Sequence, residues 1–281
     1  MRVSINLCTK NGGSRLQACL DAIELLNVPS GTELLLVDNG STDGVSYERL
    51  QAFGARTRFR CHVLQTFTPG NSAGRNLALR HATGDLQLFI DDDCYVDREF
   101  VRDWLEVFAR QPGLGYASGM VTPHDRRYSM MGCTEQATEE PVPAGHFARR
   151  GLIQGSNMAF TRACLDAVGG FDERFGAGTP FAGEEWDVAL RASAKGWSGG
   201  YFPGPRVAHD HRRTENEGRE RLLYYDYGAG AVYAKNTFRM RGRIFSSYTR
   251  ELRWLEHDRP RRAMLLRGYR DFAALAARRA A

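Results

Sequence analysis

Three consecutive carboxylates, Asp91, Asp92 and Asp93, are the residues in this sequence best suited to hold a charged ligand. They end the apolar run of the stretch LFIDDDCYVD, residues 88–97. Two like charges about 4 Å apart repel by roughly 4 kcal/mol at an effective dielectric near 20, so we expect a positive partner beside them. A divalent cation is the obvious candidate, because it prefers carboxylate oxygens as ligands. A solvated turn after a strand is the alternative that the triplet alone leaves open.

The elements that position this triplet alternate between strand and helix patterns. Strands are predicted at 3–7, 34–37, 61–65 and 86–90, and helices at 14–26 and 72–82. Continuous apolar strands separated by helices are typical of a parallel sheet that is covered on both faces. Ligands of such α/β sheets bind beyond the carboxyl ends of the strands. Polar groups follow three of these strands, so we expect the segments after Thr9, Asp38 and Asp91 to converge on one edge.

The second half of the chain mixes strands, helices and one long irregular segment. The patterns predict a helix at 98–110, a strand at 114–121, an extended segment at 155–160, a helix at 183–195 and a strand or extended arm at 201–211. Residues 123–150 lack periodicity, and a loop of that length in a compact domain is usually functional or mobile. Residues 217–281 are helical in tendency, rich in arginine and broken at Pro260.

Composition places the chain among ordinary globular proteins. Of its 281 residues, 42% are hydrophobic and 25% charged. No apolar stretch approaches the roughly 20 residues that span a bilayer, and the N-terminus lacks the long apolar region of a signal peptide. Six scattered cysteines without a C-x-x-C pair suit reduced thiols better than disulfides or a zinc site. We therefore expect a cytoplasmic protein.

The charge is distributed unevenly along the chain. From Pro205 onward there are 18 Lys and Arg against 9 Asp and Glu, whereas the whole chain has a net charge of only +5. A basic tail suits nucleic acid or an anionic membrane surface. No nucleic-acid-binding motif accompanies it, so no nucleic-acid partner is expected. Peripheral contact with the inner face of the membrane is the hypothesis that remains, with Trp254, Leu255, Leu265, Leu266 and Phe272 interspersed among the basic residues.

Two common nucleotide-binding classes are excluded by missing motifs. The first strand is not followed by the glycine-rich fingerprint of NAD enzymes, and no G-x-x-x-x-G-K-[ST] sequence is present.

Four segments together resemble the inverting family 2 of the GT-A glycosyltransferases. They are CTKNGGSRLQACLDAI, LLLVDNGSTD, GNSAGRNLALRHATGDLQLFIDDD and the interrupted stretch that runs from GSNMAFTRACLDAVGGFDERFGAG through GEEWDVALRASAKGW to VAHDH. Each is a weak match, but their order and spacing are those of the family over residues 1–211. The resemblance implies a Rossmann-like, mixed and mainly parallel α/β sheet flanked by helices. It also implies a catalytic domain at 1–211, with a nucleotide-binding half (1–97) and an acceptor half (98–211), followed by a helical basic extension at 212–281.

The resemblance also assigns roles to individual residues. Thr9, Asn11, Asp38, Arg75, Asp91 and Asp92 would bind the nucleotide of a sugar donor. Asp93 would be the direct metal ligand, with Asp91 and His209 completing the set, and Mn²⁺ or Mg²⁺ as the ion. The family's base is usually an Asp after a Glu; here the pair is Glu184-Glu185, so Glu185 takes that role and Asp187 is the second candidate.

The implied reaction is metal-dependent, inverting transfer of a sugar from a nucleotide diphosphate sugar, with a UDP-sugar favoured, to an acceptor hydroxyl. The acceptor would be a glycan, a lipid-linked sugar or a small natural product. A carboxylate must take the proton of that hydroxyl, because a neutral hydroxyl is a poor nucleophile. The alternatives are a nucleotidyltransferase of related fold and a catalytically inactive module that binds a nucleotide sugar. Two alternatives to these site roles also stay open. Asp38 could form an Asx turn, and Glu184–Glu185 could be charges that only stabilise a helix N-terminus.

Overall fold

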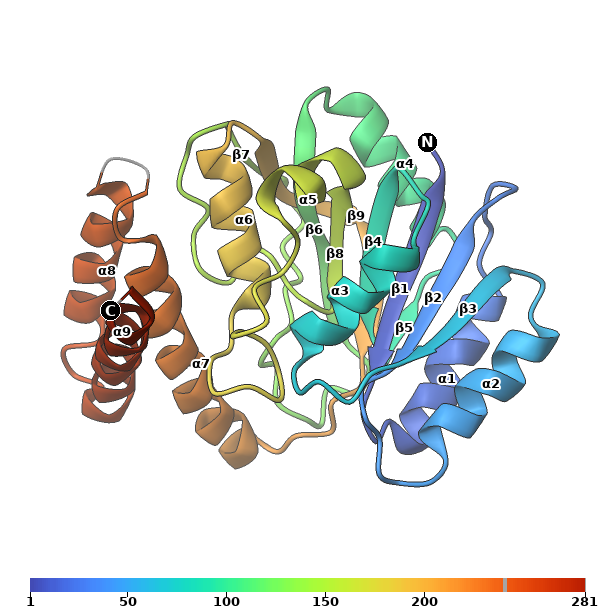
Figure 1. Cartoon of the computed structure of the whole chain (residues 1–281), viewed down its shortest axis with the longest axis horizontal. Helices are drawn as coiled ribbons and strands as arrows, with labels where there is room; N and C mark the ends of the chain where they lie inside the picture. The colour runs from blue at the N-terminus through green and yellow to red at the C-terminus, as the bar shows by residue number, and fades with distance from the viewer. Residues whose placement is uncertain (240–241, 281) are drawn as a thin grey trace.

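The computed structural model describes residues 1–239 and 242–280, and it contains one mixed sheet (Figure 1). The sheet order is β3-β2-β1-β4-β8-β6-β9-β5, with β7 paired to β9. The strands are β1 (Val3–Thr9), β2 (Glu33–Asp38), β3 (Arg60–Gln65), β4 (Leu86–Asp91), β5 (Cys94–Val96), β6 (Leu114–Pro123), β7 (Glu140–Val142), β8 (Asn157–Thr161) and β9 (Ser198–His209). The helices are α1 (Gly13–Glu24), α2 (Ser46–Arg56), α3 (Asn71–His81), α4 (Phe100–Arg110), α5 (Arg162–Val168), α6 (Glu184–Ala194), α7 (Glu215–Asn236), α8 (Arg243–Trp254) and α9 (Arg259–Ala280).

The first half of the sheet is parallel, as the apolar strands predicted. Strands β3, β2, β1 and β4 pair in parallel, whereas β8 runs antiparallel between β4 and β6. Strand β9 is parallel to β6 and antiparallel to β5 and β7. The short strands β5 and β7 were not predicted, because three residues are too few for a periodic pattern. Strand β7 lies in the 123–150 segment, which was expected to be irregular throughout.

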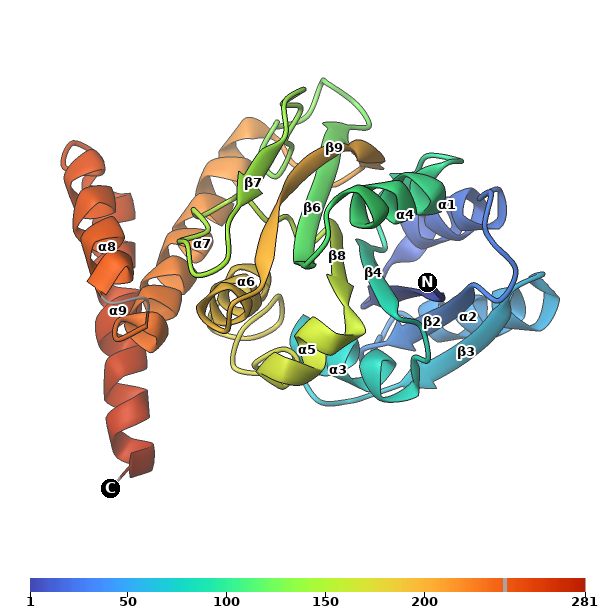
Figure 2. The ribbon, with the colours of Figure 1, turned by 90° about the horizontal axis from the view of Figure 1, so that it is seen from above.

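Alternating apolar residues distribute the helices over both faces of the sheet. Val3, Ile5 and Leu7 of β1 pack in one buried cluster with residues of α1, α2 and α4. Leu35 and Val37 of β2 face the other way and pack against α3. Figure 2 shows α1 and α4 on one side of the sheet and α3 and α5 on the other. The period of two along each strand therefore produces a three-layer α/β arrangement.

Helices α7, α8 and α9 form a separate layer at one end of the sheet, beside α6 (Figure 1). A Cβ atom at Gly230 of α7 would lie 2.1 Å from the carbonyl oxygen of Leu265, so the backbones of α7 and α9 meet at that point. Pro260 lies in the first turn of α9, where proline is tolerated, and the helical break precedes it at residues 255–258. The predicted helical tendency of 217–281 is therefore confirmed, except at residues 240–241 and 281, which lie outside the described residues.

Candidate active site

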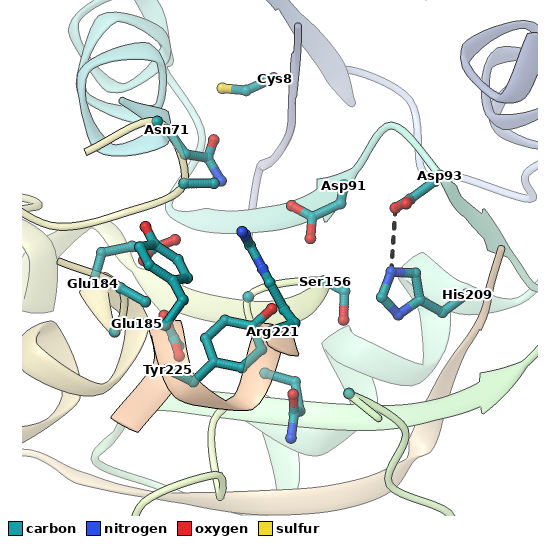
Figure 3. Close-up of a pocket in the computed structure, with 18 of the residues that line it drawn as sticks. Cys8, Asn71, Asp91, Asp93, Ser156, Glu184, Glu185, His209, Arg221 and Tyr225 are labelled. Carbon is teal, nitrogen blue, oxygen red and sulfur yellow. Dashed lines mark ion pairs between the residues drawn. The ribbon is translucent and has the colours of Figure 1, made fainter. Parts of the chain in front are cut away.

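The carboxyl ends of β1, β2 and β4 meet at one edge of the sheet, as predicted. Thr9 lies opposite Asp38 in the register, and Cys8 lies opposite Asp91. A cavity of about 630 Å³ opens at this edge (Figure 3). Its lining includes Thr9, Asn11, Arg75, Asp91, Asp92, Asp93, Glu184, Glu185 and His209 from the predicted site.

Arg75 of α3 is buried under the cavity between two carboxylates. Its Nη1 donates to Oε1 of Glu184 at 2.8 Å, and its Nη2 donates to Oδ1 of Asp91 at 3.2 Å and to the carbonyl oxygen of Gly155 at 3.1 Å. Burial raises the pKa of Asp91, although the charge of Arg75 opposes that rise. Arg75 thus fixes the end of β4 against the start of α6, and its predicted contact with the nucleotide stays a prediction.

Asp92 is held by the loop that follows β1. The Thr9 hydroxyl donates a short hydrogen bond to Oδ2 of Asp92. Burial raises the pKa of Asp92 to about 6, opposed by the Thr9 hydrogen bond and assisted by the charges of Asp93 and Asp91. The surroundings of Asp92 therefore favour the protonated carboxyl group more than those of an exposed aspartate do.

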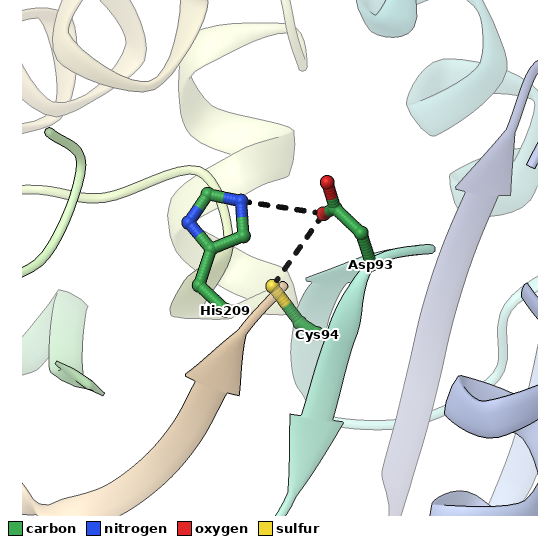
Figure 4. A group of neighbouring side chains, drawn as sticks. All are labelled: Asp93, Cys94 and His209. Carbon is green, nitrogen blue, oxygen red and sulfur yellow. Dashed lines mark hydrogen bonds and ion pairs between the residues drawn. The ribbon is translucent and has the colours of Figure 1, made fainter. Parts of the chain in front are cut away.

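Asp93 lies next to His209 at the end of β9 (Figure 4). The Nε2 atom of His209 is 3.3 Å from Oδ1 of Asp93, and Nη1 of Arg15 is 3.4 Å from Oδ2. Burial by itself would raise the pKa of Asp93, but the hydrogen bond and charge of His209, with the charge of Arg15, outweigh it and lower the pKa. The Sγ atom of Cys94 joins these two side chains, so that donor atoms of all three lie within 4.8 Å of one another.

Glu184 and Glu185 begin α6, and a glycine sets their position. Gly183 precedes them with a φ of 100°, a left-handed conformation that side chains other than glycine rarely adopt. Glu184 turns to Arg75, whereas Glu185 faces the cavity and forms no ion pair with any residue that the structure describes (Figure 3). Burial and the charge of Glu184 raise the pKa of Glu185 well above its usual range. A carboxyl group with a raised pKa is a common arrangement for a general base or acid.

Asp187, the second candidate base, does not line the cavity. Its Oδ2 accepts hydrogen bonds from Nε of Arg191 at 2.8 Å and from Nζ of Lys235 at 2.7 Å, and its Oδ1 accepts from Nδ2 of Asn236 at 3.0 Å. Burial opposes ionisation of Asp187, but Arg191 and Lys235 outweigh it and lower its pKa. The carboxylate is fully buried and joins α6 to the end of α7.

Asp38 is also fully buried, and it ends β2 beside the cavity rather than in its lining. Its carboxylate accepts hydrogen bonds from the backbone N–H of Ser41 at 3.3 Å and from Nε2 of Gln65 at 3.0 Å. The Ser41 contact spans three residues, whereas an Asx turn bonds the N–H two residues on, so this loop is not the Asx turn that the sequence left open. Asn11 accepts from the N–H of Thr42 at 2.7 Å, which ties the loop after β1 to that loop. Nucleotide contacts of Asp38 and Asn11 stay predictions.

Several residues in or beside the cavity were missed in the sequence. Cys94, which is fully buried and does not line the cavity, was expected only to be a packed thiol, and its position beside His209 depends on the antiparallel register of β5 and β9. Helix α7 contributes Arg221, Leu222, Tyr224, Tyr225 and Ala229 to the lining, and Arg213 lies just before it. Residues on both sides of the predicted division at residue 211 therefore line one cavity, and the division stays a prediction.

Two family models match the chain. The one described as "Glycosyl transferase family 2" matches residues 4–163, and "Glycosyl transferase family group 2" matches residues 88–267. The chain belongs to glycosyl transferase family 2. The resemblance drawn from the four motif segments is thereby confirmed, and so is the predicted enzyme class at the level of the family.

Relatives and solved structures agree with this assignment. The chain is 28% identical over 227 residues to the uncharacterized protein y4gI of Sinorhizobium fredii, covering 74% of this chain and 24% of that protein. This chain thus spans about a quarter of the length of y4gI. The mannosyltransferase PcManGT from Pyrobaculum calidifontis, in complex with GDP-Man and Mn²⁺, matches with a TM-score of 0.71 at 20% identity, covering 99% of this chain and 79% of the other. The structure of TarS 1–349 from S. aureus, in complex with UDP-GlcNAc, matches with a TM-score of 0.63 at 16% identity. The match covers 85% of this chain and 67% of the TarS chain. At these identities the structures show the fold alone, and the predicted GT-A architecture is confirmed.

Proposed function

We propose that the chain transfers a sugar from a nucleotide diphosphate sugar to an acceptor hydroxyl, with a divalent metal and with inversion of the anomeric configuration. The observation that carries the proposal is that Glu185 and the acids Asp91–Asp93 line one cavity of about 630 Å³. That volume is typical of a small-ligand site. Membership of family 2 argues against the nucleotidyltransferase alternative, whereas an inactive binding module remains an outcome of the experiments below.

Glu185 is the proposed base. Its carboxylate has no cation bound to it in the described part of the chain, so it is free to accept the proton of an acceptor hydroxyl. Glu184 cannot take that role while Arg75 holds its carboxylate at 2.8 Å. A single base on the face opposite the leaving group implies one displacement and therefore inversion, by the logic that applies to inverting glycosidases.

The residues around Asp93 fit a hard divalent cation. Asp93 supplies carboxylate oxygens, and Nε2 of the neighbouring His209 lies 3.3 Å from its Oδ1, so that one ion could contact both atoms. Asp93 and His209 would hold Mn²⁺ or Mg²⁺, with Asp91 as a further oxygen donor. Bound there, the ion would neutralise the charge that develops on the diphosphate leaving group. The Mn²⁺ and nucleotide sugars named for PcManGT and TarS support this choice of donor and ion.

Donor binding should therefore depend on the metal. We expect UDP or GDP to bind with Mn²⁺ or Mg²⁺ present and to lose most of its affinity after EDTA treatment. Changing a residue that only orients a metal ligand typically lowers metal affinity by about 10–100-fold. Asp93→Asn should weaken the metal-dependent binding of the nucleotide by more than that, because Asp93 would contact the metal directly. Isothermal titration calorimetry with both nucleotides measures this and also tests whether a UDP-sugar is the donor.

The matched control is Asp97→Asn, which changes an exposed acid four residues further along. It should bind nucleotide as the parent protein does. Equal nucleotide affinity with Mn²⁺ and with EDTA would contradict the metal dependence. Nucleotide-sugar binding without any turnover over a panel of acceptors would identify an inactive module.

The basic C-terminal helices are proposed to contact an anionic membrane surface. Trp254 and Leu266 are exposed, whereas Leu255, Leu265 and Phe272 are buried in the core and unavailable for such contact. None of the helices described here combines the length and apolar composition that crossing a bilayer requires. The attraction would therefore be largely electrostatic, at about 1 kcal/mol for each basic residue near the surface.

Co-sedimentation with phosphatidylglycerol vesicles measures this contact. We expect binding at low salt that weakens at physiological salt, and no binding to phosphatidylcholine vesicles. Replacing Arg243, Arg250 and Arg253, the exposed arginines of α8, by Gln should reduce binding. If the parent protein stays in the supernatant with anionic vesicles at low salt, the tail contributes only packing and charge.

A further inference from the structure

The cavity is lined by six Lys and Arg residues and by five carboxylates, but they are only partly paired with one another. Three of its six basic residues form ion pairs: Arg75 with Asp91 and Glu184, Arg15 with Asp93, and Arg150 with Asp226 and Glu251. The other three, Lys10, Arg213 and Arg221, pair with no carboxylate in the parts of the chain that are described. Unpaired cations gathered in a partly enclosed cavity attract an anionic ligand.

Arg221 is the most constrained of the unpaired three. It extends from α7 into the cavity between Asp91 and the Glu184–Glu185 pair (Figure 3). Its Nε atom is shielded from solvent and has no hydrogen-bond acceptor among the described residues. Buried donors are normally paired, so an unpaired one indicates a partner that arrives from outside.

Two tyrosines hold the guanidinium of Arg221 in place. It lies over the ring of Tyr224, 4.4 Å from the centroid, and over that of Tyr225 at 5.2 Å. The Tyr224 hydroxyl lies 3.1 Å from the carbonyl oxygen of Gly176 and 3.0 Å from that of Thr179, in the loop before α6. The guanidinium is therefore positioned before any ligand binds, which reduces the entropy lost on binding.

We propose that Arg221 is a phosphate-binding residue of this cavity. The planar guanidinium matches two phosphate oxygens, and its Nε, which has no acceptor among the described residues, would supply one of the two parallel donors. The inference rests on the proposed function, because it assigns to Arg221 either the diphosphate of the donor or a phosphate group on the acceptor. It also explains why α7, outside the motif segments, lines the cavity.

The first test compares ligands with and without phosphate. If Arg221 contacts the diphosphate of the donor, Arg221→Gln should lower the affinity for UDP or GDP, with Mn²⁺ present, by about 10–100-fold, as the loss of a charged hydrogen bond predicts. The affinity for uridine or guanosine, measured by NMR titration, should not change. Arg221→Lys should recover part of the diphosphate affinity. The matched control is Arg219→Gln, on an exposed position of the same helix, which should bind as the parent protein does.

A second titration separates the two sources of phosphate. Inorganic phosphate is added to the protein saturated with nucleoside diphosphate and Mn²⁺. If Arg221→Gln loses phosphate binding and retains its diphosphate affinity, Arg221 binds a phosphate group of the acceptor. If the variant loses diphosphate affinity and retains phosphate binding, Arg221 binds the diphosphate of the donor. If both affinities equal those of the parent, the proposal is overturned. If the parent protein binds no nucleotide, the proposed function fails, and phosphate titration of the nucleotide-free protein still decides the role of Arg221.

Discussion

Replacing Glu185 by Gln is expected to lower the rate of sugar transfer by about 10²–10⁴-fold, the usual contribution of a positioned base. The amide keeps the shape of the side chain and removes its basicity, so donor affinity should be unchanged. Steady-state transfer to a competent acceptor gives the rate, and calorimetry gives the affinity. Glu185→Asp should retain partial activity, because the shorter side chain misplaces the base without removing it.

The pH dependence of transfer provides an independent check on Glu185. Burial and the charge of Glu184 raise its pKa, whereas Arg75 opposes the rise. The base acts only when deprotonated, so transfer should increase with pH across that raised pKa and level off above it. The acid limb should therefore lie above the range of an ordinary glutamate, and Glu185→Gln should lack it.

The stereochemistry of the product tests the mechanism that Glu185 implies. The transferred sugar should have the anomeric configuration opposite to that of the donor, which NMR coupling constants report. A retained configuration would rule out single displacement. Parental transfer rates in Glu185→Gln would show that the base lies elsewhere.

Asp187→Asn is expected to act on stability rather than on chemistry. Removing the charge leaves buried Arg191 beside a neutral amide and takes away one of the two carboxylates that Lys235 contacts, the other being Asp172. Breaking a buried ion pair typically costs about 3–5 kcal/mol. Urea denaturation at neutral pH should therefore show a lower free energy of unfolding. At temperatures where the variant stays folded, its rate of transfer should be close to parental.

The sign of the pH dependence follows from the lowered pKa of Asp187. Its contribution to stability is present above the pKa of the unfolded chain and is lost as the pH falls through the lower, folded value. The difference between parent and Asp187→Asn should therefore shrink in strong acid. Asp166→Asn, which breaks an exposed i,i+4 pair with Arg162, is the control and should change stability by less than about 1 kcal/mol. A stable but inactive Asp187→Asn would instead make Asp187 the base.

Local sequence determined the parallel half of the sheet and the place of its ligand edge. Apolar strands at regular intervals can be buried on both faces only if helices cross between parallel neighbours, and parallel strands end on the same side. For that reason Thr9, Asp38 and Asp91 could be brought together from their positions at the ends of predicted strands. The acids Glu184 and Glu185 likewise indicated the start of a helix, because negative charge is favoured at a helix N-terminus.

Sequence alone did not decide which way individual side chains turn. Glu185 and Asp187 are two residues apart, about 200° around the helix, so they point in nearly opposite directions. Periodicity gives that separation but not the neighbours on each side. Asp187 accepts hydrogen bonds from Lys235 and Asn236, almost fifty residues later in the chain, and its carboxylate therefore lies outside the cavity lining.

Local sequence patterns also could not predict the ion-pair partners of Asp91–Asp93. Asp91–Asp93 were expected to need a cation, and the fold itself supplies positive partners in Arg75 and Arg15, from two different helices. Cys94 joins His209 only through the antiparallel pairing of β5 with β9. Sequence spacing determines helices and strands because hydrogen bonds and side-chain periodicity within them are local. The charges that face one another across the cavity depend on how those elements pack, and only the tertiary structure decides that.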